Sequence, residues 1–199
     1  MDATRRSLLR SAAVAATLGQ LDAQTMQHVH QHAAEAKRQG NGVYAPKALN
    51  AHEFKTVVLL ADLIIPPEAT EPGGTGAGAP EYIDLLCSGS DRMARIWQGG
   101  LAWLDAASRT RFHSAFLDAA PSQRTELLDL IAYRRNDSPE LGPGIEFFDW
   151  ARRMVVDAYF TSPAGVKALG FQGNTGMATF QVPAEALTYA LKRSPFGAG

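Results

Sequence analysis

The sequence predicts an all-α fold. Apolar residues recur at three- and four-residue spacing through residues 51–199, which is the period of an amphipathic helix. No segment alternates apolar and polar residues over the length of a strand. Proline, glycine, asparagine and serine stand where the periodic segments begin and end. The chain has 199 residues, 46% hydrophobic and 20% charged, which suits one compact helical domain (residues 51–199) preceded by a leader (1–23) and a polar, extended arm (24–50).

Charge and cysteine content exclude several classes of protein. The formal net charge of −1 leaves no excess of basic residues to neutralise a phosphate backbone, which argues against a nucleic-acid partner. Cys87 is the only cysteine, so the chain can form no internal disulfide and no Cys-x-x-Cys metal site. It follows Leu85 and Leu86 in an apolar run, and we therefore expect a buried, inert thiol.

The N-terminus has the pattern of an export signal. Arg5 and Arg6 form a basic pair, Leu8 follows two places later, and Ser11 to Leu18 form a short, alanine-rich apolar run. That run is far below the ~18 apolar residues of a membrane-spanning helix. The stretch resembles a twin-arginine signal, which predicts a periplasmic protein that meets the membrane only through its leader or its complex. The alternative is a basic amphipathic N-terminus of a cytoplasmic protein.

The arm after the leader contains three closely spaced histidines. His28, His30 and His32 could bind a metal ion, because all three would face one way in a strand, and His28 and His32 would share a face in a helix. No cluster of carboxylates or thiols nearby completes such a site. We therefore predict no metal site and interpret the arm as an extended polar segment.

The first expected helix of the domain covers residues 51–65. Asn50 and Glu53 have the spacing of a capping box, and Pro66 follows the last apolar residue. The apolar residues cover most of the helix surface, which predicts a central, buried helix. The glycine-rich loop at residues 68–80 resembles a phosphate-binding loop only superficially, because it follows a helix rather than a strand.

The remaining helices are expected to begin and end at prolines, glycines and serines. Pro80 should open a helix that ends at Ser88-Gly89, and a long helix should follow from Asp91 to Ala107. Gly99-Gly100 lies inside this long helix and predicts a kink or a close approach of another helix. Further helices are expected in the region of Phe112 and Phe116 and in the segments 121–135, 145–160 and 183–193, and Ser162 should cap a short turn that Pro163 opens.

The sequence offers no convincing catalytic or cofactor-binding residue. No serine lies on a G-x-S-x-G elbow, and no C-x-x-C-H haem attachment motif is present. Carboxylate pairs such as Glu81/Asp84 are explained by the preference of acidic residues for the first turn of a helix. Large aromatic residues are numerous instead, and some of them could form a patch for a partner protein.

Three stretches resemble a known family. The order "LLADLIIP", "GAPEYID" and "FFDWARRMVVDAYFTSPAGVKALGFQGN" is similar to the gluconate 2-dehydrogenase subunit 3 family, from about Phe54 to Asn174. This family includes the hitch-hiker subunits of FAD-dependent sugar dehydrogenases such as glucose and glucoside 3-dehydrogenase. The resemblance implies a non-catalytic small subunit that holds no cofactor of its own. It also implies a partner flavoprotein of the glucose-methanol-choline (GMC) type that binds FAD, and a multihaem subunit that carries haem c.

In such complexes the flavoprotein commonly lacks an export signal, and the small subunit supplies one for both. The resemblance thus implies a subunit that binds, stabilises and exports its dehydrogenase. The partner contacts are expected at the end of the long helix and in the irregular segment after it, at Tyr159, Phe160, Phe171 and Asn174. Two alternatives remain open: a free-standing exported metal-binding or enzymatic protein that uses the histidine arm, and a generic helical adaptor.

Overall fold

The computed structural model describes residues 23–170 and 182–194, with side chains from residue 28 onward. All regular structure in these two ranges is helical, which confirms the predicted all-α fold. The elements are α2 (Ala23–Gln39), α3 (Ala51–Ile64), α4 (Ala79–Gly89), α5 (Asp91–Phe112), α6 (Pro121–Ile131), the 3-10 helix η1 (Arg134–Asn136), α7 (Gly142–Phe160), α8 (Pro163–Ala168) and α9 (Ala184–Arg193).

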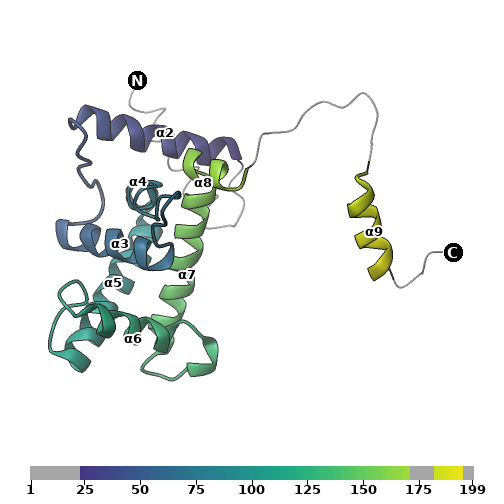
Figure 1. Cartoon of the computed structure of the whole chain (residues 1–199). Coiled ribbons are helices and arrows are strands. Elements are labelled where there is room, and N and C mark those ends of the chain that lie inside the picture. Colours follow the sequence, from purple (N-terminus) through teal and green to yellow (C-terminus); the bar gives the residue numbers. More distant parts are fainter. Residues whose placement is uncertain (1–22, 171–181, 195–199) are drawn as a thin grey trace.

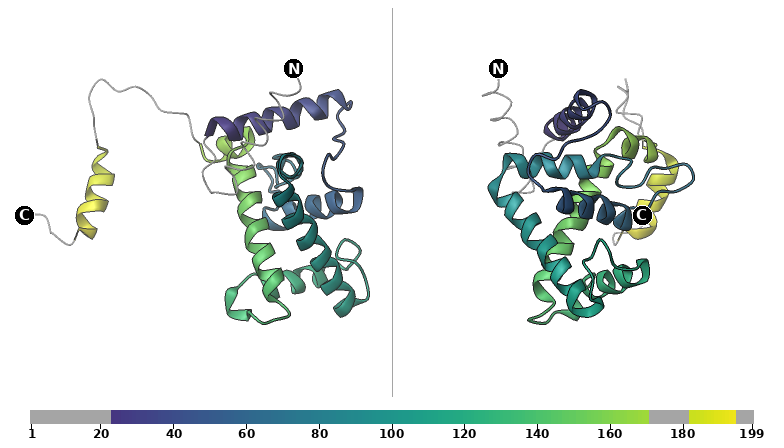
Figure 2. Two further views of the ribbon diagram at one scale, coloured as in Figure 1. Left: turned by 180° about the vertical axis from the view of Figure 1, so that it is seen from behind. Right: turned by 90° about the vertical axis from the view of Figure 1, so that its left-hand side faces the viewer.

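Two long helices, α5 and α7, lie side by side and form the frame of the domain (Figure 1). Helix α4 packs against both of them and also against α2 and α3. Figure 2 shows α2 across one end of this frame and α6 across the other. The hydrophobic core lies between these helices, and its largest fully buried side chains include Trp97, Tyr82 and Phe116.

The central helix is α4 rather than α3. Every residue from Ala79 to Cys87 is buried, whereas α3 buries only Thr56, Val57, Leu60 and Ala61. The prediction that the helix after Asn50 is the central one is therefore wrong, since part of its apolar surface, including Leu63, faces solvent. The prediction of a buried Cys87 is confirmed at 3% exposure, and burial raises the pKa of its thiol.

Local sequence signals for helix starts are confirmed by the caps. The Asn50 side chain accepts hydrogen bonds from the backbone N–H groups of His52 and Glu53, and Glu53 accepts one from the Asn50 N–H. These contacts form the predicted capping box. Ser162 caps α8 by accepting a hydrogen bond from the Gly165 N–H. Pro80 lies in the first turn of α4, as predicted.

The glycine pair in α5 marks a close helix contact. Helix α5 is continuous from Asp91 to Phe112, five residues longer than its predicted end, and Phe112 is its last residue rather than part of a separate helix with Phe116. A Cβ atom added at Gly100 would collide with the ring of Phe147 on α7, whereas one added at Gly99 would meet nothing within 4 Å. The predicted close approach is therefore confirmed at Gly100.

The predicted extended arm is a helix over most of its length. Helix α2 spans Ala23–Gln39, and Val29 and Ala33 on its inner face are 1% and 7% exposed in the core. These two residues and partly buried Ala36 recur at helical spacing, so the segment folds because α4 covers its apolar side. Within the arm, the connection over residues 40–50 lacks regular structure.

The terminal helix is confirmed as α9, and all its side chains are exposed (Figure 1). None of the helices in the described part of the chain has the length and apolar character that a membrane span requires.

Candidate functional site

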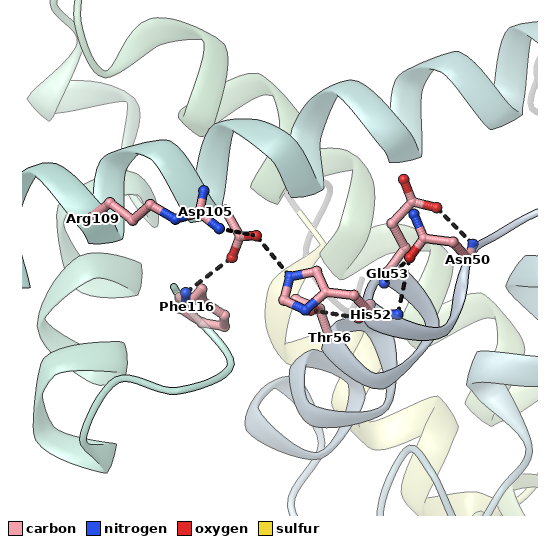
Figure 3. Close-up of polar contacts among 7 residues, drawn as sticks. All are labelled: Asn50, His52, Glu53, Thr56, Asp105, Arg109 and Phe116. Carbon is pink, nitrogen blue, oxygen red and sulfur yellow. Dashed lines mark hydrogen bonds and ion pairs between the residues drawn. The ribbon is translucent and has the colours of Figure 1, made fainter. Parts of the chain in front are cut away.

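The polar pair that most resembles a catalytic arrangement joins α3 to α5. The His52 Nε2 atom lies 2.7 Å from Asp105 Oδ2 (Figure 3). Asp105 is 7% exposed and also accepts hydrogen bonds from the Phe116 N–H at 3.0 Å and from Arg109 at 3.4 Å. Its carboxylate thus ties α3, α5 and the segment before α6 together. In the described part of the chain no hydroxyl or thiol side chain hydrogen-bonds the His52 ring, so the geometry fits a structural role.

A second buried carboxylate fastens the connection between α2 and α3 to the central helix. Asp84 on α4 is fully buried and accepts four hydrogen bonds at 2.7–3.0 Å, from the Tyr44 hydroxyl and from the backbone N–H groups of Lys47, Ala48 and Leu49. Burial and the nearby Asp84 charge raise the pKa of Tyr44, so its hydroxyl stays protonated and donates. This contact set, here called the Asp84 anchor, holds the end of the α2 connection in place.

A surface groove of about 640 Å³ lies between α2, the start of α4 and α8. Most of its lining atoms are apolar or belong to small residues, so a large apolar side chain from another molecule could enter it. We call it the α2–α8 groove, and the small and apolar residues that line it are Ala33, Ala34, Gly76, Ala77, Gly78, Pro163 and Val166.

Charged residues stand at the edge of the α2–α8 groove. Lys37 Nζ lies 3.3 Å from Glu81 Oε1, and Arg38 on the same helix is exposed. Glu81 is 7% exposed and lies in the first turn of α4, where the helix dipole favours an acidic residue. Its Oε2 atom has no hydrogen-bond partner among the described residues. The groove is therefore mostly apolar, and its charged lining residues are Lys37 and Arg38 from α2 and Glu81 from α4.

His30 fixes one wall of the groove to the other. Its Nε2 atom is 3.0 Å from Thr161 Oγ1, and its ring lies 4.8 Å from that of Tyr82. Burial lowers the pKa of His30 from 6.5 to about 4, against a raising effect from a hydrogen bond to the Ala158 backbone. The imidazole is therefore neutral at neutral pH and serves as a packing and hydrogen-bonding group.

The three histidines of the predicted arm do not meet. His28 is exposed, His30 lies against Tyr82, and His32 is 3.5 Å from Glu35 one turn along the helix. The described ranges contain no group of three or more histidine, cysteine, aspartate or glutamate residues that could hold a metal ion.

The residues predicted to contact a partner differ in their surroundings. Tyr159 is 5% exposed and packs edge-on against Phe160, whose ring centroid is 5.0 Å away and which is itself 41% exposed. Phe160 therefore presents an aromatic surface beside α8, whereas the Tyr159 ring serves the core. Phe171 and Asn174 lie outside the described residues, as do Arg5, Arg6 and Leu8 of the leader.

Comparison with known proteins gives one positive result. The gluconate 2-dehydrogenase subunit 3 family matches residues 51–176, which is more than half of the chain. The chain belongs to this family. No curated protein and no solved structure matches the chain.

Membership in the subunit 3 family identifies the chain as an accessory subunit of a dehydrogenase complex. The match includes α3 to α8 and therefore one wall of the α2–α8 groove, but it leaves out α2 and α9. The groove is thus built partly from the family's own helices and partly from a helix outside the matched segment.

Sequence reasoning missed α2 as a wall of the groove. The signal was present, because Val29, Ala33 and Ala36 have the spacing of one helix face. The polar residues between them and the nearby glycines favoured an extended interpretation instead.

Proposed function

We propose that the chain is the non-catalytic small subunit of a periplasmic, FAD-dependent sugar or polyol dehydrogenase complex. It binds and stabilises a GMC-type flavoprotein that oxidises the substrate, and a multihaem cytochrome c subunit receives the electrons. The observation that carries the proposal is the subunit 3 family match over residues 51–176. The chain itself holds no cofactor in this proposal, because FAD and haem c belong to the partner subunits.

Co-purification tests this proposal directly. The tagged chain, isolated from its native host, should bring with it a flavoprotein whose sequence mass spectrometry identifies as GMC-type and whose flavin absorbance is stoichiometric. The chain expressed alone should show neither flavin nor haem absorbance and no sugar oxidation. Stoichiometric flavin on the isolated chain, or a partner without flavin, would contradict the proposal.

The subunit also carries the flavoprotein across the membrane by the twin-arginine route in this proposal. The support is the leader pattern of Arg5, Arg6 and Leu8. A flavoprotein that loads FAD in the cytoplasm must cross already folded, and a bound subunit with such a leader can take it along. Replacing Arg5 and Arg6 with lysine keeps the charge but changes the shape of the cationic group. Both subunits of this double variant should then accumulate in the cytoplasm, as fractionation and immunoblotting would measure.

A flavoprotein that still reaches the periplasm with the double lysine variant would refute the carrier role. If the double lysine variant stops export of the small subunit alone, the leader is an export signal, but the flavoprotein does not depend on it for its own export.

The α2–α8 groove is the part of the described surface that best suits contact with the flavoprotein. It is mostly apolar, small residues line it together with Lys37, Arg38 and Glu81, and exposed Phe160 ends the helix that leads into its α8 wall. Ala34 lies in the groove and is exposed, so a tryptophan there fills the groove without entering the core. Ala34→Trp should weaken flavoprotein binding about tenfold or more, which is the loss expected when a central contact is blocked.

Ala102 on α5 provides the matched control. It is also an exposed alanine on a helix, and it does not line the groove. Ala102→Trp should bind the flavoprotein like the unchanged chain, and both variants should keep the melting temperature of the parent. Equal binding by Ala34→Trp and Ala102→Trp would exclude the groove as a contact surface.

A further inference from the structure

A buried carboxylate in the α2–α8 groove lacks a hydrogen-bond donor. Three buried polar side-chain atoms have no partner among the described residues: Glu81 Oε2, the Tyr82 hydroxyl and Ser108 Oγ. Of these three residues only Glu81 lines the groove, and only Glu81 carries a carboxylate. A buried acceptor without a donor costs stability, and the cost is larger for a carboxylate than for a hydroxyl. The unpaired oxygen therefore points to a donor that another molecule supplies.

The donors that the domain itself places near Glu81 are already engaged. Lys37 Nζ lies 3.3 Å from Oε1, the other oxygen of the carboxylate. The Ala79 N–H donates to the Gly74 carbonyl, and Pro80 has no N–H. The two carboxylate oxygens can exchange places, because the terminal torsion of a glutamate side chain is broad. A donor that enters the groove can thus bond one oxygen while Lys37 keeps the other.

The charges of the groove select a neutral donor. Lys37 and Arg38 line the groove together with Glu81, so two cations stand beside one carboxylate. A lysine or arginine side chain from another molecule would meet a net positive charge there. An anionic side chain would leave Oε2 unpaired and would put two carboxylates into a mostly apolar groove. A neutral N–H or O–H group avoids both costs.

The apolar lining selects an aromatic body behind that donor. Ala33, Ala77 and Val166 are among the lining residues, and the groove volume of about 640 Å³ lies in the range of ligand pockets. Tyrosine and tryptophan combine a large apolar ring with a polar tip, and both are enriched at protein interfaces. The indole of tryptophan is the better match to an unpaired acceptor, because its N–H only donates.

We propose that the flavoprotein subunit inserts one tryptophan side chain into the α2–α8 groove, where the indole N–H donates to the Glu81 carboxylate. This inference rests on the proposed function and adds the side chain by which the partner is recognised. Glu81 is then a specificity residue. An aromatic ring without a donor fills the same apolar space but leaves the carboxylate unpaired, so it binds less tightly.

Two small probes test the groove without the flavoprotein. 3-Methylindole has the tryptophan ring with its N–H, and 1,3-dimethylindole has the same ring without the donor. Each is titrated into the isotope-labelled full chain, and the amide signals of Ala33, Ala77 and Val166 report binding in the groove. 3-Methylindole should bind about tenfold more tightly than 1,3-dimethylindole, which is the advantage expected from one hydrogen bond to a charged acceptor.

A leucine variant tests whether Glu81 is the acceptor. Glu81→Leu keeps an apolar side chain of similar length in the groove, and the two probes should bind this variant within about twofold of each other. Glu126→Leu on α6 is the control, because Glu126 is exposed and does not line the groove; it should keep the tenfold difference. Thermal melting checks that both variants are folded.

The flavoprotein identified by co-purification gives the second readout. Its dissociation constant, measured by biolayer interferometry, should rise about tenfold with Glu81→Leu, as for the loss of a central contact. With Glu126→Leu the constant should stay within about twofold of the parent value.

Four outcomes would each overturn the inference. Equal binding of both probes to the unchanged chain would mean that water or a rearranged side chain already satisfies Glu81. Tighter binding of n-butylammonium than of 3-methylindole would make a cation the occupant. Unchanged flavoprotein binding by folded Glu81→Leu would show that the partner does not use Glu81, although the proposed function stands. If the unchanged chain captures no flavoprotein, the proposed function itself fails, and the flavoprotein is not the occupant whatever the probes show.

Discussion

Replacing Asp84 with alanine removes the acceptor for four donors at once. The Tyr44 hydroxyl and the Leu49 N–H are buried at this contact, whereas the N–H groups of Lys47 and Ala48 are partly exposed. In the variant, water can reach the two partly exposed donors. The two buried donors lose their partner and gain none.

The expected loss in the free energy of unfolding follows from the two buried donors that lose their acceptor. A buried donor without a partner costs about 1–3 kcal/mol, so Asp84→Ala should lower the free energy of unfolding by about 2–6 kcal/mol. Asp84→Asn keeps the volume and one acceptor oxygen. Its NH₂ group, however, faces two donors in place of the second oxygen, so it should recover only part of the loss.

Urea denaturation followed by circular dichroism measures the effect as a change in midpoint at constant slope. Asp118→Asn serves as the control, because Asp118 is exposed and its carboxylate accepts no hydrogen bond from another side chain in the described ranges. This control should stay within about 0.5 kcal/mol of the parent. Hydrogen exchange should localise the loss to residues 44–49 and α2, which the Asp84 anchor holds.

A loss below about 1 kcal/mol for Asp84→Ala would refute this reasoning, because it would mean that the two buried donors find water or another acceptor. Full recovery of stability by Asp84→Asn would refute it too. The negative charge would then contribute nothing to the four hydrogen bonds.

Two further predictions concern packing and pH. Gly100→Ala should destabilise the domain by about 1–3 kcal/mol, because its Cβ meets the Phe147 ring, while Gly99→Ala in the same helix should be neutral or stabilising by up to about 1 kcal/mol. Thermal melts of the two alanine variants distinguish the cases. His30 has a folded pKa of about 4 against 6.5 unfolded, so the unfolded chain takes up the proton first and stability is lost as pH falls from 6.5 to 4. Discounted for the partial exposure of His30, the loss is on the order of 1–2 kcal/mol, and it should be absent in His30→Gln but present in the exposed-site control His28→Gln.

The sequence predicts local features of the fold well because those features depend on neighbouring residues. The capping box at Asn50, the Ser162 cap and the proline at the start of α4 each need only residues within one turn. The close helix approach at Gly100 is also predictable, because glycine inside a long helix costs stability unless a neighbouring element needs the space. The partner, Phe147, is 47 positions away and could not be named from spacing.

The features that the sequence did not predict depend on contacts between distant segments. Helix α2 forms because α4 covers Val29 and Ala33, and the residues of α2 alone do not show that another helix will pack on them. Asp84 has the appearance of an acidic residue in a helix turn, and its four donors come from residues 35–40 positions earlier. Tyr159 and Phe160 are adjacent aromatics, and only the packing of the helix decides which of the two is exposed.

The Asp84 anchor and the α2–α8 groove are coupled through α2, although no Asp84 atom lines the groove. The anchor holds residues 44–49, which fix the far end of the α2 connection, and α2 supplies one wall of the groove. A partner that binds only the ordered groove stabilises it by mass action, and a weaker anchor lowers the fraction of chains in which the groove is ordered. Asp84→Ala should therefore weaken binding of the proposed flavoprotein partner as well as the fold, in proportion to the loss of α2 protection. Unchanged binding by an Asp84→Ala chain with unprotected α2 would show that the partner does not use the α2 wall.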